Sequence, residues 1–510
     1  MLARVMSLGI SGIDGFPVAV EVDRSGGMPG FDVVGLPDAS VKESRERVRS
    51  ALRNSALEYP VGHYTINLAP ADMKKEGPSF DLPIAVGVMV CAGAISQQAL
   101  DSTMISGELA LSGEVNMING ALPMAIAARE LGYKRLVLPR GNADEARCIS
   151  GIDIIPVDTI NDVADYFGGK RPITPISTAT YQELLSTREY KSDFADVRGQ
   201  RAAKRALEIA AAGSHNVIMV GEPGSGKTML ARCLPSILPD MTFEEALEVT
   251  RIHSVAGTNR GCGLMTARPF RAPHHTASAV SIVGGGANAM PGEISKAHRG
   301  VLFLDELPEY PRAVLEALRQ PLEDGFVTVT RAHAHAVYPA RLMLVCSMNP
   351  CPCGYFGSRT HECRCTPVDV RRYRNKISGP LLDRIDIQIE VESVPINQIA
   401  MKSNEESSET IRARVNAARQ IQIERYANDG ITCNAQLTSR LFDKYCVMTP
   451  NANKLLSSAA DMMRLSSRGY TRVLKVARTI ADLAGGGDIE EAHVAEAVQY
   501  RSLDGKYWNV

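Results

Sequence analysis

The chain has 510 residues, of which 45% are hydrophobic and 22% are charged, and its formal net charge is −1. This composition is typical of a globular protein of two to four domains, and it excludes a chain that is basic throughout, so any contact with nucleic acid must be local. The longest apolar run, Leu82–Ile95, is short for a membrane span and predicts a buried helix. No secretory pattern begins at Met1, so the eleven cysteines are expected to be reduced thiols in a cytoplasmic protein that does not contact a membrane.

The first 168 residues alternate between strand-like and helix-like segments. Examples are the strand pattern Phe31–Leu36 and the helix pattern Ser40–Asn54. The stretch Arg171–Thr180 is rich in Pro, Thr and Ser, which disfavour regular structure. We therefore predict an N-terminal domain over residues 1–168 and a linker over residues 169–189.

A glycine-rich loop follows the apolar run Val217–Val220 and precedes a helix start. Its residues are Gly221, Glu222, Pro223, Gly224, Ser225, Gly226, Lys227 and Thr228. In this strand–loop–helix context the backbone N–H groups turn toward phosphate oxygens. Lys227 would reach the β- and γ-phosphates, and the Thr228 hydroxyl would bind Mg²⁺. The loop thus predicts ATP and Mg²⁺ as ligands, with Gly199 and Gln200 upstream placed to cover the adenine.

Two further buried strands end in polar residues. The strand Val301–Leu304 is followed by Asp305, a candidate Mg²⁺ ligand, and by Glu306, a candidate for polarising the attacking water. The strand that begins at Leu342 is followed by Asn349, which would lie between the γ-phosphate and that water. The alternatives are a surface acidic pair and an ordinary Asn-Pro turn. The order behind the phosphate loop favours an ATP-hydrolysis site.

Arg384 resembles an arginine finger, which completes the ATP site of a neighbouring subunit and stabilises the charge of the transition state. The alternative is a salt bridge with Asp383 or Asp386. A finger predicts a ring of identical subunits whose sites are shared, because the arginine acts in trans.

The C-terminal region, residues 393–510, is predicted to be a helical lid. The segments Ile411–Ala427 and Tyr470–Ala484 have helical periodicity. A cation at the start of the second segment looks like a sensor 2 residue. Arg472 is preferred to Arg468, because it lies within the first helical turn.

These features together resemble the AAA+ superfamily and, in detail, its magnesium-chelatase-like branch. The whole chain is similar to the YifB/ComM family. The stretches that carry this resemblance are Ala206–Gly213, Arg268–His275 and Leu318–Glu323.

The resemblance implies an α/β multidomain protein. Its parts would be an N-terminal α+β domain like that of Lon proteases, an AAA+ core with a parallel sheet over residues 190–392, and the helical lid. It also implies a hexameric ATP-driven ring that acts on branched, single-stranded or double-stranded DNA. The expected role is a branch-migration helicase that promotes integration of DNA in natural transformation or recombination. The alternative is a chelatase-type remodeller that acts on a protein partner.

The N-terminal region resembles Lon proteases around Lys75–Ser79 and over Gly107–Val115. A Ser–Lys dyad needs a lysine to deprotonate the serine. The stretch that matches the position of this lysine, Asn119–Met124, contains none. We therefore expect a Lon-like fold without peptidase activity, in which Ser79 is structural.

Two segments resemble the pore-facing elements of this AAA+ branch. One is the helix-2 insert, Ala272–Arg299, which contains Lys296. The other is the pre-sensor-1 hairpin, Phe326–Val337, whose alternation is typical of a β-hairpin. Period 2 predicts that three candidate DNA contacts share one strand face: Arg331, His333 and His335. The alternative is a solvated polar face.

A basic run that includes Arg371 and Arg372 is interleaved with an aromatic residue. Such a run could contact a phosphate backbone or acidic groups of a neighbouring subunit, and the residues do not decide between these two interpretations.

Two Cys-x-Cys pairs, Cys351 with Cys353 and Cys363 with Cys365, are separated by nine residues. Four thiolates can make a closed tetrahedral Zn²⁺ site, and His361 could replace one of them. This predicts a zinc clip over residues 351–365, with a metal-free loop as the alternative.

Overall fold

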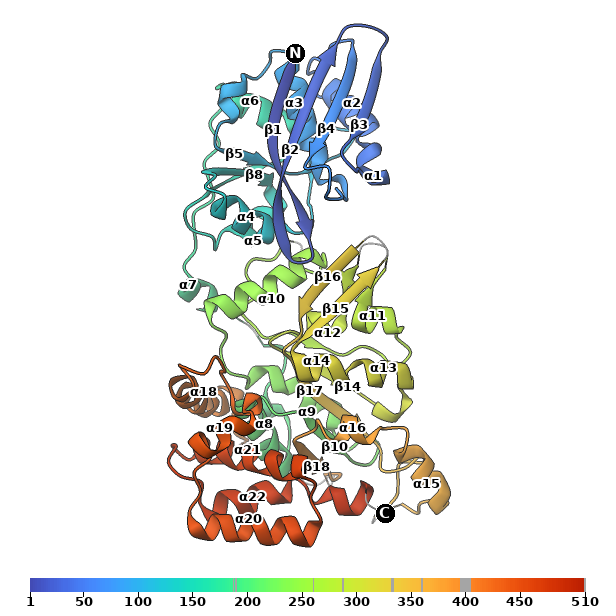
Figure 1. Ribbon diagram of the computed structural model, residues 1–510, viewed down its shortest axis with the longest axis vertical. Coiled ribbons are helices and arrows are strands. Elements are labelled where there is room, and N and C mark those ends of the chain that lie inside the picture. Colours follow the sequence, from blue (N-terminus) through green and yellow to red (C-terminus); the bar gives the residue numbers. More distant parts are fainter. Residues whose placement is uncertain are drawn as a thin grey trace.

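The computed structural model describes residues 1–510 except 187, 189, 260, 287–288, 332–333, 359–360, 395–404 and 509–510. Figure 1 shows three parts that follow one another along the long axis: an N-terminal sheet domain, a central α/β domain and C-terminal helices at the far end. Of the helices in the described ranges, none combines the length and the apolar character needed to cross a membrane.

The N-terminal domain is built on a seven-stranded sheet in the order β3-β4-β2-β1-β5-β8-β9. The strands are β1 Leu2–Ser11, β2 Asp14–Ser25, β3 Gly30–Val34, β4 His63–Ala69, β5 Thr103–Ile105, β8 Arg135–Pro139 and β9 Asp153–Val157. β1 and β2 form a long antiparallel hairpin in which Leu2 pairs with Asp23 and Ser11 with Asp14. β1, β5, β8 and β9 are parallel neighbours. A separate small ribbon joins β6 Glu108–Leu109 and β7 Val115–Asn116.

Helices cover this sheet. They are α1 Ala39–Lys42, α2 Ser44–Asn54, α3 Asp81–Cys91, α4 Ala121–Glu130, α5 Arg140–Ala146 and α6 Ile160–Phe167. Every residue of α3 is buried, which agrees with the buried helix predicted from the apolar run. The segment predicted as one helix over Ser40–Asn54 consists of two helices, α1 and α2, that meet at Glu43.

The segment predicted as a linker is attached to both neighbouring domains. Its Ile176 N–H donates to the carbonyl of Ile154 in the N-terminal domain, over 3.0 Å. It contains a short helix, α7 Tyr181–Ser186, and the Tyr181 hydroxyl donates to the carbonyl of Met241 over 2.7 Å. The segment is therefore a packed connection rather than a free tether.

The central domain contains a five-stranded sheet in the order β11-β14-β17-β10-β18, and all neighbouring strands are parallel. The strands are β10 Val217–Val220, β11 Phe270–Arg271, β14 Val301–Leu304, β17 Met343–Met348 and β18 Ile387–Glu390. The helices of this domain are α8 Arg201–Gly213, α9 Lys227–Cys233, α10 Phe243–Val255, α11 Ala279–Val283, α12 Glu293–Lys296, α13 Arg312–Ala317, α14 Arg319–Asp324, α15 Pro367–Arg374 and α16 Gly379–Leu382. A two-residue ribbon, β12 Gly284–Gly285 with β13 Met290–Pro291, lies within the predicted insert. The parallel order places the carboxyl ends of β14, β17 and β10 side by side.

The predicted hairpin forms as β15 Phe326–Arg331 and β16 Ala334–Pro339. In Figure 1 the turn of the β1–β2 hairpin points toward it. Ile13, at that turn, packs against the core cluster that contains Val329 and Tyr338. Asp14 forms an ion pair with Arg251 of α10. The N-terminal sheet is thus joined directly to the central domain at its longest hairpin.

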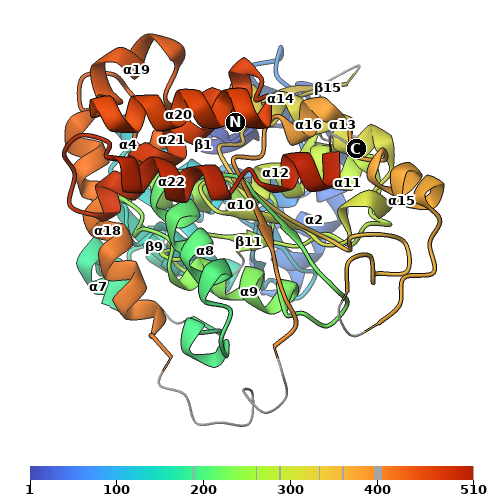
Figure 2. The same cartoon turned by 90° about the horizontal axis from the view of Figure 1, so that it is seen from below.

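The C-terminal region is helical, as predicted. Its helices are α18 Ser408–Arg425, α19 Ser439–Tyr445, α20 Pro450–Met463, α21 Ser467–Leu483 and α22 Glu491–Gln499, followed by a turn of π-helix at Asp504–Trp508. α18 and α21 pack against α8 of the central domain. In Figure 2, seen from below, α15 projects on the side of the molecule opposite to α18.

Candidate active site

Three neighbouring strand ends form the candidate site. β10 ends at Val220 and leads into the glycine-rich loop, β14 ends one residue before Asp305, and β17 ends one residue before Asn349. All residues of these strands are buried, which fixes the positions of the polar groups that follow them. The structure therefore brings together Lys227, Thr228, Asp305 and Asn349 from among the residues that the sequence predicted for the site.

Lys227 begins helix α9 and is 8% exposed. Its ammonium group donates to the carbonyls of Gly221 and Glu222, each over 2.8 Å, and lies 3.4 Å from the Asn349 side-chain oxygen. Burial lowers the pKa of Lys227, against the opposite effect of nearby carboxylates, chiefly Asp305. The loop thus curls around one buried cation, which is the arrangement that a phosphate group needs.

Thr228 and Asp305 form the candidate magnesium site. The Thr228 hydroxyl donates to a carboxylate oxygen of Asp305 over 2.8 Å, and the Ser347 hydroxyl donates to the other oxygen. A hydroxyl beside a carboxylate fits a hard cation that keeps most of its ligands as water or phosphate. Ser347 is a contact that the sequence interpretation missed, although its position near the end of β17 could have indicated it.

Glu306 stands apart from this network. Its side chain is 56% exposed, and its backbone has a positive φ of 53°. The Nδ1 atom of His275 lies 3.5 Å from a Glu306 carboxylate oxygen. Exposure leaves the carboxylate free to orient a water molecule. The contact with His275 was not predicted, even though the Arg268–His275 stretch stood out in the sequence.

Gln200 connects the segment upstream of the loop to the loop itself. Its side-chain amide donates to the carbonyls of Ser225, over 3.1 Å, and Glu392, over 2.6 Å. The backbone N–H of Gly199 donates to Glu405 of the lid over 3.0 Å. These contacts place Gly199 and Gln200 where core, loop and lid meet, which suits the predicted role beside an adenine.

Arg384 lies near the amino-terminal ends of the strands, on the side of the sheet opposite to the phosphate loop. The Asn216 side chain, just before β10, donates to the Arg384 carbonyl over 2.8 Å. β10 has four residues, so its two ends are roughly 13 Å apart. Arg384 also lines a cavity of about 520 Å³ together with Gly300 and Arg341, which flank the amino ends of β14 and β17. The structure therefore does not bring Arg384 to the phosphate loop of its own chain.

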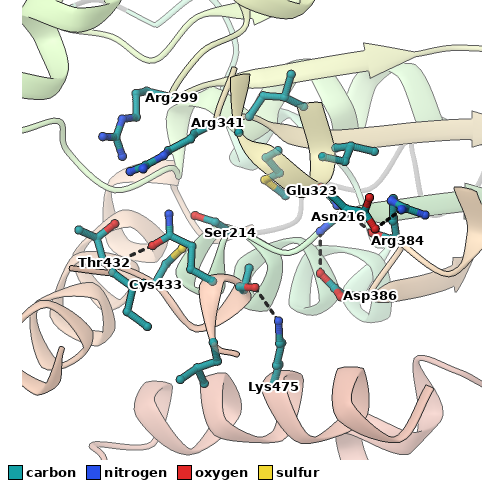
Figure 3. A pocket seen from close by; sticks show the side chains of 18 of the residues that line it. Ser214, Asn216, Arg299, Glu323, Arg341, Arg384, Asp386, Thr432, Cys433 and Lys475 are labelled. Atoms are coloured by element: carbon teal, nitrogen blue, oxygen red, sulfur yellow. Dashed lines mark hydrogen bonds and ion pairs between the residues drawn. The ribbon is translucent and has the colours of Figure 1, made fainter. Parts of the chain in front are cut away.

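The ion-pair partner of Arg384 is Glu323 (Figure 3). This corrects the alternative considered from the sequence, in which Arg384 pairs with Asp383 or Asp386. Asp383 instead pairs with Arg468 over 3.1 Å, and Asp386 pairs with Arg472. The Arg384 side chain is 12% exposed, whereas that of Glu323 is 57% exposed.

Arg472 lines the same cavity as Arg384, at the amino edge of the sheet. Burial alone would raise the pKa of the Asp386 carboxyl, but the charge of Arg472 and a hydrogen bond from His215 hold that pKa well below its usual range. Arg472 is therefore held against the core by a buried charge, and it too lies away from Lys227 of the same chain. Arg468, the alternative, is 63% exposed.

The candidate DNA contacts have different surroundings. His333 lies outside the described residues, as do the side chains of Arg331 and His335. The backbone pairs Arg331 with Ala334 and Thr330 with His335. The prediction that Arg331 and His335 share the face of a single strand is therefore wrong, because the chain reverses between them and they belong to successive rungs of a ribbon.

Of the three remaining basic residues predicted to contact DNA, one forms an ion pair within the protein and two are exposed to solvent. The Lys296 ammonium group pairs with Glu293 over 3.3 Å, and its side chain is 18% exposed. Arg371 and Arg372 are exposed on α15. The last two thus present charge to solvent, whereas Lys296 is mostly enclosed.

The four cysteines of the predicted clip converge. The Sγ atom of Cys351 lies 3.4 Å from that of Cys353 and 3.7 Å from that of Cys363, and all four Sγ atoms, including that of Cys365, lie within 4.8 Å of one another. A tetrahedron with Zn–S bonds of 2.3 Å has sulfur atoms ~3.8 Å apart. The arrangement therefore fits a four-thiolate metal site. His361 is not part of this cluster; its ring stacks on Tyr355.

Hydrogen bonds from the backbone support this fit. N–H groups of Tyr355 and Arg364 lower the pKa of Cys353 to about 6. Outer hydrogen bonds of this kind are typical of the second shell of metal sites.

Ser79 is the residue that the sequence resemblance places at the nucleophile position of Lon proteases. Lys75 is fully buried and donates to the carbonyls of Pro70 and Met73, the latter over 2.8 Å. Ser79 lines a cavity of about 210 Å³ in which the titratable groups are Glu76, Glu108 and Tyr338. The absence of peptidase activity from this domain stays a prediction.

Sequence families of magnesium chelatase match most of the chain. The family described as magnesium chelatase, subunit ChlI, matches residues 193–399, the family described as subunit ChlI of Mg-chelatase matches residues 20–142, and the corresponding C-terminal family matches residues 405–501. The Magnesium-chelatase 67 kDa subunit of Chlorobaculum tepidum is 30% identical over 161 residues, which is 31% of this chain and 23% of that protein.

Two relatives cover nearly the full length. The Competence protein ComM of Haemophilus influenzae is 42% identical over 505 residues, which is 98% of each chain. The Uncharacterized protein YifB of Escherichia coli is 42% identical over 496 residues, which is 97% of this chain and 96% of that protein. The chain therefore belongs to the YifB/ComM family of magnesium-chelatase-like proteins.

Proposed function

We propose that this protein is an ATPase that works as a ring of six subunits and that it drives branch migration of DNA. The observation that supports the ATPase most strongly is the cluster at the carboxyl edge of the sheet. There Lys227 would bind phosphate, Thr228 and Asp305 would hold Mg²⁺, and Glu306 with Asn349 would orient water. Bound Mg²⁺ would neutralise charge on the phosphates during hydrolysis.

Sharing of sites between subunits would explain why two arginines lie near the amino-terminal ends of the strands, far from the phosphate loop of their own chain. Arg384 and Arg472 line one cavity there, away from Lys227 of their own chain. In a ring, the amino edge of one subunit can face the carboxyl edge of the next. Arg384 would then exchange its partner Glu323 for a neighbour's γ-phosphate, as an arginine finger does.

DNA is proposed as the substrate on two grounds. The relative of nearly equal length from Haemophilus influenzae is named a competence protein. The β15–β16 hairpin, which carries Arg331 and His335, and the exposed pair Arg371 and Arg372 offer basic positions for phosphate contacts. The matches to magnesium chelatase favour a second candidate, a remodeller that acts on a protein partner.

The decisive test is ATP hydrolysis with and without a labelled mobile four-way DNA junction, with strand separation followed in the same tube. We expect the junction to stimulate turnover and the strands to exchange, because a translocating motor couples the two. The Lys227→Ala variant serves as the control for a contaminating ATPase. If the rate of ATP hydrolysis were the same with and without every DNA tested, the role as a protein remodeller would be favoured.

We also propose that the four cysteines hold Zn²⁺. Elemental analysis of protein purified without chelator should find about one zinc per chain. The double variant Cys363→Ser, Cys365→Ser should lose it, because two of four ligands are gone. Cys262→Ser is the matched control, since Cys262 is exposed and outside the cluster. Wild-type protein free of zinc would refute the site.

A further inference from the structure

The four-cysteine loop is continuous with the candidate active site. β17 ends at Met348, Asn349 follows, and Cys351 comes two residues later and is fully buried. A turn closes at once, because the Gly354 N–H donates to the Cys351 carbonyl over 3.0 Å. Any shift of the cysteine cluster is therefore passed along two peptide units to Asn349.

The same turn touches the phosphate loop from the other side. Gly354 has a φ of +90°, and a Cβ atom placed there would lie 2.6 Å from Cγ and 2.7 Å from Cδ of Pro223. Contacts this short do not occur between real atoms, so only glycine allows this approach. The cysteine loop and the phosphate loop are packed together without spare room.

A buried arginine fixes the backbone between Asn349 and the cysteines. Arg374 donates through Nε and Nη2 to the Pro350 carbonyl, each over 3.3 Å. Its guanidinium lies 4.9 Å from the ring of Phe356, in the cysteine loop, and 4.4 Å from the ring of Tyr507. The segment is thus held from α15 as well as from the cluster.

We propose that metal at the four cysteines is a positioning element for ATP hydrolysis: by fixing the turn Cys351–Gly354, it fixes both Asn349 and the phosphate loop. This inference rests on the proposed zinc site and the proposed ATPase. Most described residues of the loop between the cysteine pairs are exposed or half-buried, so packing against the rest of the protein does little to fix the conformation of this loop. Metal ligation supplies the missing constraint.

Two glycine substitutions in this loop test the coupling. Gly354→Ala drives a methyl group into Pro223 while all four cysteines stay in place. Gly357→Ala is the matched control, because Gly357 has a similar φ of +81° and no described residue lies within 4 Å of the added atom. Both variants carry the same backbone penalty, so only the clash with Pro223, which Gly354→Ala adds, separates them.

We expect Gly354→Ala to keep its zinc and to lose about tenfold or more in kcat/KM for ATP, since small displacements of catalytic groups have large kinetic effects. Gly357→Ala should keep both its zinc and its turnover. Equal turnover in the two variants would overturn the proposal.

The zinc-free double variant Cys363→Ser, Cys365→Ser provides an independent test of the proposal, which can be made even if Gly354→Ala does not fold. It should show a comparable loss in kcat/KM with its fold retained. Wild-type turnover in this zinc-free protein would overturn the coupling. Absence of zinc from the wild type would instead refute the metal site, and absence of turnover from the wild type would refute the ATPase.

Discussion

Lys227→Ala is expected to abolish ATP turnover, with a loss of at least about 100-fold, because the substitution removes the one buried cation around which the phosphate loop is organised. Its ammonium group is 2.8 Å from two loop carbonyls and 3.4 Å from Asn349. The alanine variant loses the charge that would meet the β- and γ-phosphates. Steady-state phosphate release measures the effect.

Lys444→Ala is the control for loss of a lysine. Lys444 lies on the lid, where it pairs with Asp429 over 3.2 Å, and its side chain is 58% exposed. Removal of this surface charge should leave turnover unchanged. Undiminished hydrolysis by Lys227→Ala would show that the ATP site lies elsewhere in the chain.

Arg384→Ala should bind nucleotide normally but hydrolyse it roughly 10³–10⁵-fold more slowly, the range typical of a lost arginine finger. Binding should survive because Arg384 lies at the opposite edge of the sheet from the phosphate loop of its own chain. Fluorescent nucleotide binding and single-turnover hydrolysis measure the two properties separately.

Mixing subunits tests whether the arginine acts in trans. Arg384→Ala subunits retain Glu306, and Glu306→Gln subunits retain Arg384. A mixed ring therefore contains some interfaces at which both groups are intact, and it should recover part of the activity that each variant lacks alone. A mixture as inactive as its components would contradict shared sites.

Glu323→Gln separates the finger from a merely structural ion pair. This variant removes the only ion-pair partner recorded for Arg384 in the described chain but leaves the arginine itself. A finger should still work, so hydrolysis should stay near the wild-type level. If Glu323→Gln reproduced the loss seen with Arg384→Ala, the arginine would be structural.

The proximity of the strand-end residues could be predicted from the sequence because the information for it is local. Each functional residue follows a short, continuously apolar strand, and such strands are buried in parallel sheets, whose carboxyl ends meet. Asp305 and Asn349 could therefore be placed beside the phosphate loop without knowledge of the fold. The two C-terminal helices α18 and α21 were equally predictable from their periodicity.

Partners that are distant in sequence were not predictable. Arg384 has two acidic neighbours along the chain, yet its partner is Glu323 on α14, which no periodicity links to it. The prediction that Arg331 and His335 share one strand face failed for a different reason. Alternation of Ala and His continues through the turn after Arg331, so the pattern does not show where the chain reverses.

The β1–β2 hairpin has a mechanical consequence for a motor. The strand β1 pairs with β2 along its whole length, and the hairpin ends at a turn that is held to the central domain by the Asp14–Arg251 ion pair and by the packing of the partly buried Ile13 against the core cluster that contains Val329. A paired ribbon of this length is stiff. If the β15–β16 hairpin moves in the proposed ATPase cycle, the movement must either carry the seven-stranded sheet with it or break these contacts, so the N-terminal domain would resist the motion.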